Sequence, residues 1–332
     1  MSQRALGPFT VSALGLGCMG MSHGYGDADA DESAAVLHRA LDLGCTLLDT
    51  AALYGFGRNE SLLGETLHER RQDFVLTSKC GMFKNDAGQR TIDGRPSTLR
   101  QTCEDSLRRL RTDVIDLYYL HRVDPQVPLA DSIGTLAELV AEGKIRTIGL
   151  SEVSAETLRQ AHAIHPITAL QSEYALWSRN VEIKVLTTCQ ELGIAFVAFS
   201  PLGRGFMTGH LGNSPSFAEN DIRRNLPRFN PENFELNQNL LEYLVELATA
   251  QSCTPAQLAL AWVLTRGEHV FAIPGTTRLP HLEENLGATS VTLTTETVQR
   301  LDEVFSPDAI AGPRYPASTQ KEIGTEEFPG SA

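Results

Sequence analysis

The sequence alternates repeatedly between short apolar segments and longer segments whose apolar residues recur at helical spacing. Short apolar runs are typical of parallel strands buried on both faces, and here they lie at 14–17, 46–49, 74–79, 114–120, 145–150, 168–171, 194–199 and 270–273. A helical pattern follows each run, as in 31–43, which ends at Gly44, a residue that commonly stops a helix. Eight strands alternating with helices predict an α/β fold, a single (β/α)8 TIM barrel.

The remaining segments add detail to this barrel. Helical periodicity predicts helices over 31–43, 60–69, 97–111, 129–142, 155–163, 181–192, 236–250, 254–265, 280–286 and 295–305, the last ones being extra C-terminal helices. A Gly-Pro pair indicates an N-terminal hairpin within 2–13, and a long irregular loop, 202–235, follows the seventh strand. The tail 307–332 contains four prolines and no periodicity, so we expect it to be irregular. No linker divides the chain, which predicts one domain over 1–332.

An open, doubly wound sheet is the alternative architecture. Its dinucleotide fingerprint, Gly-x-Gly-x-x-Gly after the first strand, is matched by Gly15-Leu-Gly17-Cys-Met-Gly20. Glycine-rich turns match that spacing by chance. A dinucleotide-binding unit of about 30 residues also needs an acidic residue at the end of its second strand. Asp49 does not fill that role, because it lies close to Tyr54 in the sequence and is grouped with it instead. The strand count favours the barrel.

Net charge and cysteine usage restrict the partners. The formal net charge of −13 makes the chain a poor general binder of nucleic acid or of anionic membrane, so an anionic ligand needs local cations or backbone N–H groups. No apolar run reaches the 18 residues of a membrane span, and the N-terminus lacks the apolar core of a signal peptide. The six scattered cysteines contain no Cys-x-x-Cys, and there is no His-Glu-x-x-His, which predicts a cytoplasmic protein with no catalytic metal.

Polar residues follow several of the predicted strands. In a barrel of this kind the catalytic groups come from the carboxyl ends of the strands, which meet at one face. Those ends read Gly17-Cys18, Asp49, Lys79, His121, Ser151-Glu152, Gln171, Ser200 and Pro274-Gly275. The sequence therefore predicts an active site at this face.

Asp49, Tyr54, Lys79 and His121 together form a group that can donate a proton. A free phenol has a pKa of about 10, and a nearby ammonium lowers it. Asp49 can hold the Lys79 ammonium, and His121 can hydrogen-bond a carbonyl oxygen while Tyr54 protonates it. Singly, each has a structural alternative: Asp49 as a helix cap, Lys79 as a surface lysine, His121 as a satisfied strand-end residue and Tyr54 as a packing residue.

Seven sequence blocks, in this order, resemble the aldo-keto reductases from Gly15 to about Ala288. They are Leu-Asp-Thr-Ala-x-x-Tyr-Gly (48–55), Thr-Ser-Lys (77–79), Asp-x-Tyr-Tyr-Leu-His-Arg-Val-Asp-Pro (116–125), Gly-Lys-Ile-Arg-x-Ile-Gly-Leu-Ser-Glu (143–152), Gln-Ser-Glu-Tyr-x-Leu-Trp-Ser-Arg (171–179), Phe-Ser-Pro-Leu-Gly-Arg-Gly (199–205) and Ile-Pro-Gly-Thr-Thr-Arg (273–278). The details are similar to the bacterial and plant branch of longer reductases, which act on free aldehydes and ketones. The resemblance implies that Tyr54 is the acid/base, that Lys79 and Asp49 tune it and that His121 orients the substrate.

The same resemblance implies a nicotinamide cofactor, NADPH/NADP+, bound without a Rossmann domain. The cofactor contacts that it implies are Gly17, Met19, Asp49, Ser151, Gln171, Phe199, Ser200, Pro201, Leu202, Gly203, Gly205, Thr277, Arg278, His281, Glu284 and Asn285. Ser151 and Gln171 match residues that hydrogen-bond the nicotinamide carboxamide. Phe199 matches an aromatic residue that stacks on the nicotinamide ring. The glycines of 202–205 match a loop that approaches the pyrophosphate. Glu152 stands where many relatives carry Asn. Arg278 lies just before a predicted helix, where its guanidinium and the helix N–H groups can bind the adenosine 2′-phosphate. We therefore predict a preference for NADPH over NADH.

The substrate is expected to be a small carbonyl compound, in a pocket walled by Tyr25, Phe83, Trp177 and the loop 202–235. Trp177 can equally be core packing, and Cys18 and Cys80 beside the site can be oxidation-sensitive or small packing residues. Two other functions stay open: a cofactor-binding sensor with little turnover, and a Schiff-base aldolase with Lys79 as nucleophile. The oligomeric state is left open.

Overall fold

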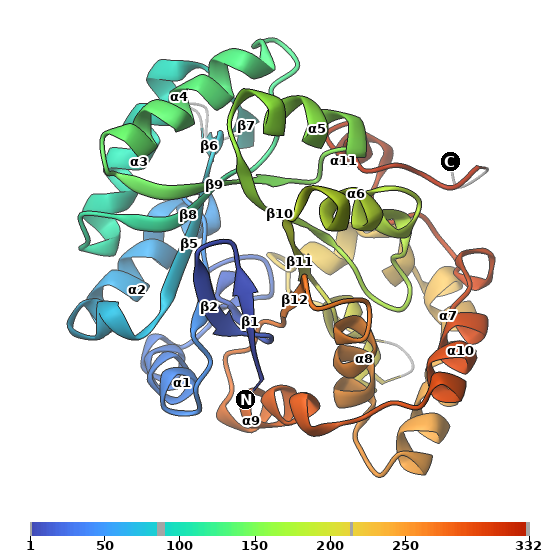
Figure 1. Ribbon diagram of the computed structural model, residues 1–332. Coiled ribbons are helices and arrows are strands. Elements are labelled where there is room, and N and C mark those ends of the chain that lie inside the picture. Colours follow the sequence, from blue (N-terminus) through green and yellow to red (C-terminus); the bar gives the residue numbers. More distant parts are fainter. Residues whose placement is uncertain (1, 85–89, 213–214, 330–332) are drawn as a thin grey trace.

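Eight parallel strands form a closed barrel in the computed structural model, which describes residues 2–84, 90–212 and 215–329 (Figure 1). In spatial order the strands are β3 (Leu16–Gly17), β4 (Leu47–Asp49), β5 (Val75–Cys80), β8 (Ile115–Leu120), β9 (Ile145–Ser151), β10 (Ile167–Glu173), β11 (Ala195–Phe199) and β12 (Val270–Ile273). Two parallel bridges, Leu14–Ala272 and Gly17–Gly275, join the first strand to the last. The predicted barrel is confirmed, and the open-sheet alternative is wrong.

Helices surround this barrel in the predicted alternation (Figure 1). They are α1 (Ala30–Asp42), α2 (Arg58–Leu67), α3 (Pro96–Leu110), α4 (Leu129–Ala141), α5 (Ala155–Ile164), α6 (Val185–Leu192), α7 (Pro231–Ala250), α8 (Pro255–Leu264), α9 (Leu279–Gly287), α10 (Thr295–Val304) and the short α11 (Ala317–Gln320). Helix α7 begins at Pro231 rather than at the predicted 236, because Asn230 is extended and proline suits the first helical position. Among the described helices, none is long and apolar enough to cross a lipid bilayer.

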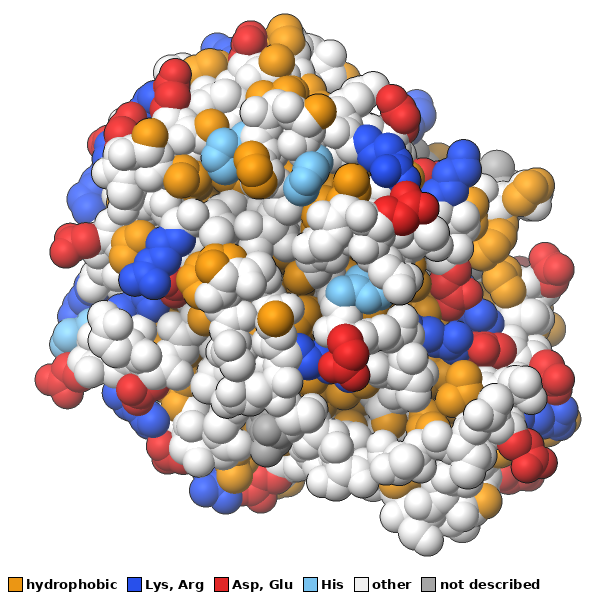
Figure 2. Space-filling model, viewed as in Figure 1, with side chains coloured by type: hydrophobic (Ala, Val, Ile, Leu, Met, Phe, Trp, Pro, Cys, Tyr) orange, Lys and Arg blue, Asp and Glu red, His pale blue; other side chains and the backbone are white. Residues whose placement is uncertain are grey.

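Two hairpins lie at opposite ends of the barrel. The predicted N-terminal hairpin, β1 (Gln3–Leu6) and β2 (Phe9–Ser12), crosses the near end of the barrel in Figure 1. The second hairpin, β6 (Met82–Lys84) and β7 (Arg90–Ile92), follows β5 and was not predicted, since its two strands are too short to show an alternating pattern. On the face with the first hairpin, acidic and basic side chains of the described residues lie mainly around the rim, without a large patch of one sign (Figure 2).

Apolar side chains fill the barrel interior and a second layer between strands and helices. The interior cluster includes Leu47, Leu117, Tyr119, Val197 and Phe271, and the N-terminal hairpin adds Leu6 and Val11 as a plug. Gly149 is required beside this cluster, because a Cβ there would lie 2.3 Å from the Tyr119 ring. The interior is therefore a packed core, and ligands are confined to the barrel ends.

The loop after β11 and the C-terminal tail both lie near the carboxyl end of the strands. The described residues of the loop include the short 3-10 turns η5 (Gly203–Thr208), η6 (Ile222–Asn225) and η7 (Pro227–Phe229). The tail contains η9 (Pro307–Ala309) and α11, and it is held where the Gly324 amide donates a 2.8 Å hydrogen bond to the Glu152 carbonyl. Tail residues Arg314 and Tyr315 are buried.

Candidate active site

The structure brings Asp49, Tyr54, Lys79 and His121 to the same end of the barrel. Asp49 ends β4, Lys79 lies in β5, His121 follows β8, and Tyr54 begins the 3-10 turn η2 (Tyr54–Gly57). The Lys79 ammonium donates to Asp49 Oδ2 at 2.5 Å, to the Thr50 carbonyl at 2.8 Å and to the Tyr54 hydroxyl at 3.4 Å. Lys79 is 1% exposed, so it is not a surface lysine.

Asp49 is bound on both of its oxygens. While Oδ2 accepts from Lys79, Oδ1 accepts hydrogen bonds from Thr77 Oγ1 at 2.7 Å and from Gln171 Nε2 at 2.8 Å. Buried carboxylates need such partners, and these three donors come from side chains rather than from a helix N-terminus. Asp49 is therefore not a helix cap. It holds Lys79 in a fixed position beside Tyr54.

The Tyr54 phenol stays protonated at neutral pH in this arrangement. Burial raises its pKa, and the Lys79 ammonium lowers it only partly, so the pKa lies above its ordinary value. The sequence led us to expect a net lowering by the ammonium. The structure corrects that expectation, because the cost of burying a phenolate outweighs the attraction of Lys79, which Asp49 already neutralises.

His121 faces Tyr54 as a neutral imidazole. The two ring centroids are 6.0 Å apart, with the planes at 83°. Burial, with the charge of Arg122 next to it, holds the pKa of His121 well below its usual range. Its Nδ1 is buried and has no hydrogen-bond partner among the described residues. A neutral imidazole carries one N–H donor, which suits hydrogen bonding to a carbonyl oxygen.

Arg122 is a site residue that the sequence did not single out. Its guanidinium donates to the His121 carbonyl at 2.6 Å and to Ser151 Oγ at 3.2 Å, and it is buried. It forms no ion pair within the described parts of the chain. An arginine directly after a strand is usually exposed, so only its position beside His121 could have pointed to it.

The residues expected to contact nicotinamide lie at neighbouring strand ends. Ser151 and Gln171 are register partners in β9 and β10, and both are buried. Phe199 ends β11 and is partly exposed, opposite Ile273 of β12. Gly17 pairs with Gly275, and a Cβ on Gly17 would lie 2.8 Å from the Ile273 carbonyl oxygen. Met19 begins the short turn η1 (Met19–Met21) next to it.

Left-handed backbone conformations cluster around the loop after β11. Gly203 and Gly205 have φ of +57° and +94°, and the non-glycine residues Ser200 and Arg204 have φ of +49° and +57°. A Cβ on Gly205 would make ordinary contacts with the Arg223 guanidinium at 3.5 Å and Leu211 at 3.9 Å, so glycine is favoured here by its positive φ and not by lack of space. Strained residues of this kind are common at functional sites. Pro201 and Leu202, the other two residues of this loop that were expected to contact the cofactor, are buried.

The residues expected at the adenosine end surround the start of α9. Arg278 is the exposed N-cap residue of that helix and pairs with no carboxylate among the described residues. His281 is exposed and stacks on His210, with the centroids 6.1 Å apart. Thr277 and Glu284 are partly exposed and Asn285 is buried.

Five further side chains that the sequence placed beside the site differ in their burial. Trp177 is 3% exposed and stacks on Phe206 at 4.5 Å, so it belongs to the core and does not line an open pocket, whereas Tyr25 and Phe83 are partly exposed. Cys18 and Cys80 are fully buried, and burial raises the pKa of each thiol far above its ordinary value. A reactive thiolate is therefore disfavoured at both positions.

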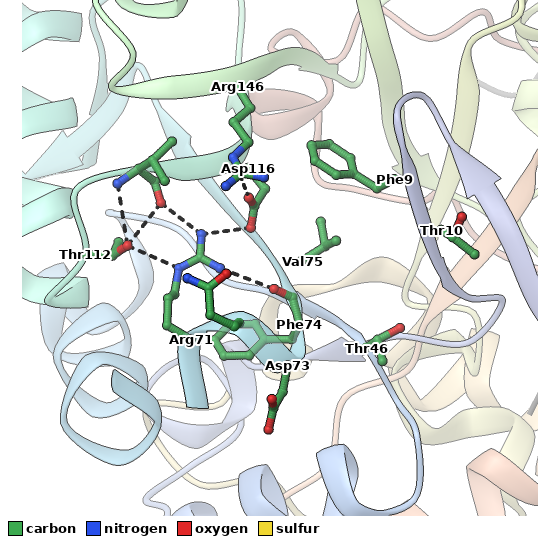
Figure 3. A pocket seen from close by; sticks show the side chains of 12 residues that line it. Phe9, Thr10, Thr46, Arg71, Asp73, Phe74, Val75, Thr112, Asp116 and Arg146 are labelled. Carbon is green, nitrogen blue, oxygen red and sulfur yellow. Dashed lines mark hydrogen bonds and ion pairs between the residues drawn. The ribbon is translucent and has the colours of Figure 1, made fainter. Parts of the chain in front are cut away.

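A separate hollow of about 230 Å3 lies at the opposite end of the barrel, where the strands begin (Figure 3). Its charged groups are paired: Arg71 donates to Asp116 Oδ2 at 2.8 Å, and Arg146 lies 3.3 Å from Asp116 Oδ1. Arg71 also donates to the Phe74 and Val114 carbonyls. With its polar groups satisfied by one another, this hollow is part of the barrel base. No cluster of metal-ligating side chains occurs in the part of the chain that the structure describes.

Comparison with known families agrees with this geometry. The family model described as "Aldo/keto reductase family" matches residues 13–305. The chain belongs to the aldo/keto reductase family. It is 41% identical over 326 residues to a Schizosaccharomyces pombe aldo-keto reductase, yakc, whose name includes NADP(+), with 96% of each chain covered. It is 43% identical over 309 residues to a probable aldo-keto reductase 1 of Glycine max, covering 92% of this chain and 89% of that protein.

Solved aldo/keto reductases and related dehydrogenases share the fold. A glycerol dehydrogenase of Gluconobacter oxydans is 26% identical with a TM-score of 0.84, and 98% of each chain is covered. A Klebsiella pneumoniae aldo/keto reductase solved with NADP and acetate is 30% identical with a TM-score of 0.71, covering 90% of this chain and 93% of that one. A K. pneumoniae aldo-keto reductase solved with NADPH is 28% identical with a TM-score of 0.72, covering 92% and 96%.

Proposed function

We propose that this aldo/keto reductase reduces an aldehyde or ketone to an alcohol with NADPH, as a carbonyl reductase in which Tyr54 is the proton donor. The observation that carries the proposal is the buried hydrogen-bonded group of Asp49, Lys79 and Tyr54, with His121 facing the same hydroxyl-bearing ring. A protonated phenol beside a neutral imidazole is suited to a carbonyl oxygen that gains negative charge.

The strand ends fit a nicotinamide dinucleotide. When bound, NADPH supplies the hydride. Ser151 and Gln171 offer buried polar side chains for the carboxamide, and Phe199 offers a partly exposed ring face. In the loop after β11, the Gly203 and Gly205 amides donate to the Ser200 and Leu202 carbonyls at 2.9 and 3.1 Å, and this left-handed turn is proposed to lie against the pyrophosphate. The solved K. pneumoniae relatives, which hold NADP and NADPH, support this assignment.

Each catalytic side chain has a distinct role in the proposal. His121 donates a hydrogen bond that orients the substrate carbonyl. Tyr54 transfers the phenolic proton to the same oxygen, and Lys79 stabilises the phenolate that remains. Asp49 keeps Lys79 charged and in place. The substrate is proposed to be a small carbonyl compound.

The aldolase alternative is not supported by the state of Lys79. Burial acts to lower the pKa of Lys79, but Asp49 and Tyr54 outweigh it and keep the pKa above its ordinary value. An ammonium group held by three oxygen acceptors cannot attack a carbonyl carbon. The same positive charge is what a proton-donating tyrosine requires.

Substitution of Tyr54 by Phe tests the proposal. The phenyl ring keeps the packing against His121 and removes only the proton donor, so we expect kcat to fall by about 10²-fold or more. Turnover is followed by NADPH absorbance with a panel of aliphatic and aromatic aldehydes. Tyr243→Phe, at an exposed tyrosine on α7, is the matched control and should turn over at the parental rate.

The same measurements separate an enzyme from a cofactor-binding sensor. If the parental protein binds NADPH but turns over no aldehyde in the panel, the reductase proposal fails and the result supports a cofactor-binding sensor. If Tyr54→Phe turns over at the parental rate when the chemical step limits, another residue donates the proton.

A further inference from the structure

The C-terminal tail reaches a buried group of charges beside the loop after β11. We define the tail cluster as Glu152, Glu173, Arg204, Arg228, Arg314 and Tyr315. Every side chain in it except Arg204 belongs to a residue at most 9% exposed, and the Arg204 side chain is 8% exposed. Glu152 directly follows β9, Glu173 ends β10, and Arg314 and Tyr315 come from the tail. The cluster thus joins segments that are distant in the sequence.

Glu152 directs its carboxylate to the tail. Oε1 accepts from the Arg314 guanidinium at 2.6 Å and from the Glu173 amide at 2.9 Å, and Oε2 accepts from Thr325 Oγ1 at 2.7 Å. Its backbone is left-handed, with φ of +54°, directly after Ser151. Both oxygens are therefore engaged, which explains how a buried acid is accommodated at this position.

Glu173 is the centre of the cluster. It accepts from Ser178 Oγ at 2.7 Å, from the Tyr315 hydroxyl at 3.0 Å and from Arg204 at 3.0 Å, and Arg314 Nε lies 3.7 Å away. Burial opposes its ionisation, but the guanidinium groups around it outweigh burial and lower its pKa to about 2. Within the cluster, three guanidinium groups face two carboxylates, which leaves an excess of positive charge.

Arg204 connects the cluster to the loop. Its backbone lies between Gly203 and Gly205, with φ of +57°, a conformation that costs a non-glycine residue free energy. Its side chain turns inward and donates to Glu173 at 3.0 Å and to the Tyr315 hydroxyl at 2.9 Å. The buried side chain therefore holds the strained backbone of the loop in place.

We propose that Tyr315 and Arg314 of the tail are positioning residues for the cofactor pyrophosphate, acting through Arg204. By fixing Arg204, they hold the left-handed turn from Gly203 to Gly205 in the conformation against which the pyrophosphate would lie, and the excess positive charge favours an anion there. This inference rests on the proposed NADPH site. It predicts that the tail contributes to cofactor affinity without touching the reacting atoms.

Tyr315→Phe tests the link with the smallest change. The ring, whose centroid lies 5.5 Å from the Arg204 guanidinium carbon, is kept, while the hydroxyl that contacts Arg204 and Glu173 is lost. We expect the NADPH dissociation constant, measured by quenching of protein fluorescence, to rise about three- to tenfold, the loss typical of one ordinary hydrogen bond, because Tyr315 acts on the cofactor only through Arg204. The KM for NADPH should rise likewise, with kcat at saturation unchanged.

Tyr174→Phe is the control for a purely structural loss. The Tyr174 hydroxyl is also buried and donates to a carboxylate, Glu182, at 2.6 Å, but none of its hydrogen bonds involves the tail cluster. This variant should lose thermal stability comparably and bind NADPH like the parent. Equal weakening of NADPH binding by Tyr174→Phe and Tyr315→Phe would mean that lost stability explains both, and would overturn the inference.

A double-variant cycle tests whether the tail acts through Arg204. Arg204→Met should weaken NADPH binding at least as much as Tyr315→Phe, and the double variant should be no weaker than Arg204→Met alone, because coupled residues are not additive. Additive losses would overturn the inference. Arg314→Met should weaken binding further than Arg314→Lys, which keeps the charge.

These measurements are independent of turnover, so they separate two kinds of failure. If Arg204→Met leaves NADPH affinity unchanged, the loop does not hold the pyrophosphate and the inference falls, whatever Tyr54→Phe does to kcat. If Arg204→Met weakens NADPH but Tyr315→Phe and Arg314→Met do not, the cofactor site stands and the role of the tail is wrong.

Discussion

Gln171, near the carboxyl end of β10, donates a 2.8 Å hydrogen bond to Asp49, at the end of β4, across the mouth of the barrel. In the strand order β3-β4-β5-β8-β9-β10-β11-β12, these two strands lie on opposite sides. Asp49 is therefore held from both sides of the mouth, by Gln171 and by Lys79. The position of Lys79, and through it that of Tyr54, depends on a contact that spans the whole site.

Lys79→Met should damage catalysis and change its pH dependence. Removing the ammonium takes away the charge that partly lowers the pKa of Tyr54, so the phenol becomes a weaker acid and the phenolate harder to form. We expect kcat for carbonyl reduction to fall by about 10²-fold or more. Alcohol oxidation, which needs the phenolate, should rise with pH in the parent and reach its plateau at higher pH in the variant. A profile with an unchanged midpoint would show that Lys79 does not tune Tyr54.

The stability of the fold should fall as the pH drops below about 6.5, the ordinary pKa of histidine. Burial holds the pKa of His121 well below that value, so the unfolded chain binds a proton that the folded chain does not. Each such histidine costs up to about 1.4 kcal/mol per pH unit between its folded pKa and 6.5. Urea unfolding between pH 5 and 8 measures the slope.

His121→Gln provides the comparison for that slope. His23 and His269, whose pKa values are also lowered by burial, contribute with the same sign and remain in the variant. The variant should therefore show a shallower fall below pH 6.5, not a flat line. An identical slope in parent and variant would mean that His121 takes up its proton in the folded protein as readily as in the unfolded one.

Arg278→Ala should reduce the preference for NADPH over NADH. Arg278 is exposed, occupies the N-cap position of α9 without a side-chain capping bond, and pairs with no carboxylate among the described residues, so it is available to a 2′-phosphate. A hydrogen bond to a charged group is worth about 1.5–3 kcal/mol, or roughly ten- to a hundredfold in the NADPH dissociation constant. Fluorescence titration of both cofactors checks this. NADH binding should change little, and equal weakening of both would exclude Arg278 from phosphate recognition.

Arg71→Met should destabilise the protein without changing catalysis. It removes one partner of the buried Asp116, at the end of the barrel away from the candidate active site, and leaves the more distant Arg146. Breaking a buried ion pair costs about 3–5 kcal/mol, and the remaining arginine should keep the loss near the lower end. Urea unfolding measures it, with kcat as the second readout.

Arg70→Met is the matched control for Arg71→Met. Arg70 adjoins Arg71 in the sequence but pairs with the half-exposed Asp42 and Asp73. Exposed pairs contribute little, so the midpoint of unfolding should hardly move. If both variants lost a similar free energy of unfolding, the charge of Asp116 would still be compensated when Arg71 is absent.

The sequence predicted those parts of the site that the barrel topology dictates. Once the strands are found, the carboxyl ends of parallel strands must meet at one face, which brings Asp49, Lys79 and His121 together. The pairing of Glu152 with Arg314 could not be found in this way. It joins residues 162 positions apart, and neither periodicity nor local spacing encodes a contact made by an irregular tail.

The direction of the Tyr54 pKa shift was also beyond the sequence. Opposing effects of burial and of Lys79 act on the phenol, and their balance depends on how far Asp49 already compensates the ammonium. The buried Arg122 shows the same limit, because its residue type predicts exposure and only the packing reveals the contact with Ser151.

Among the residues that the structure describes, two bridges, Leu14–Ala272 and Gly17–Gly275, close the barrel wall between its first and last strands. Strand β3 is two residues long. The two bridges join residues 258 positions apart in the sequence, so bringing these two segments together has the largest loop-closure entropy cost in the sheet. Few hydrogen bonds across a junction mean a low free energy of local opening. Amide hydrogens of Gly15 and Gly17, which bond to the Ala272 and Pro274 carbonyls, should exchange with solvent before those between β8 and β9. The wall of this barrel therefore opens first where its two ends meet.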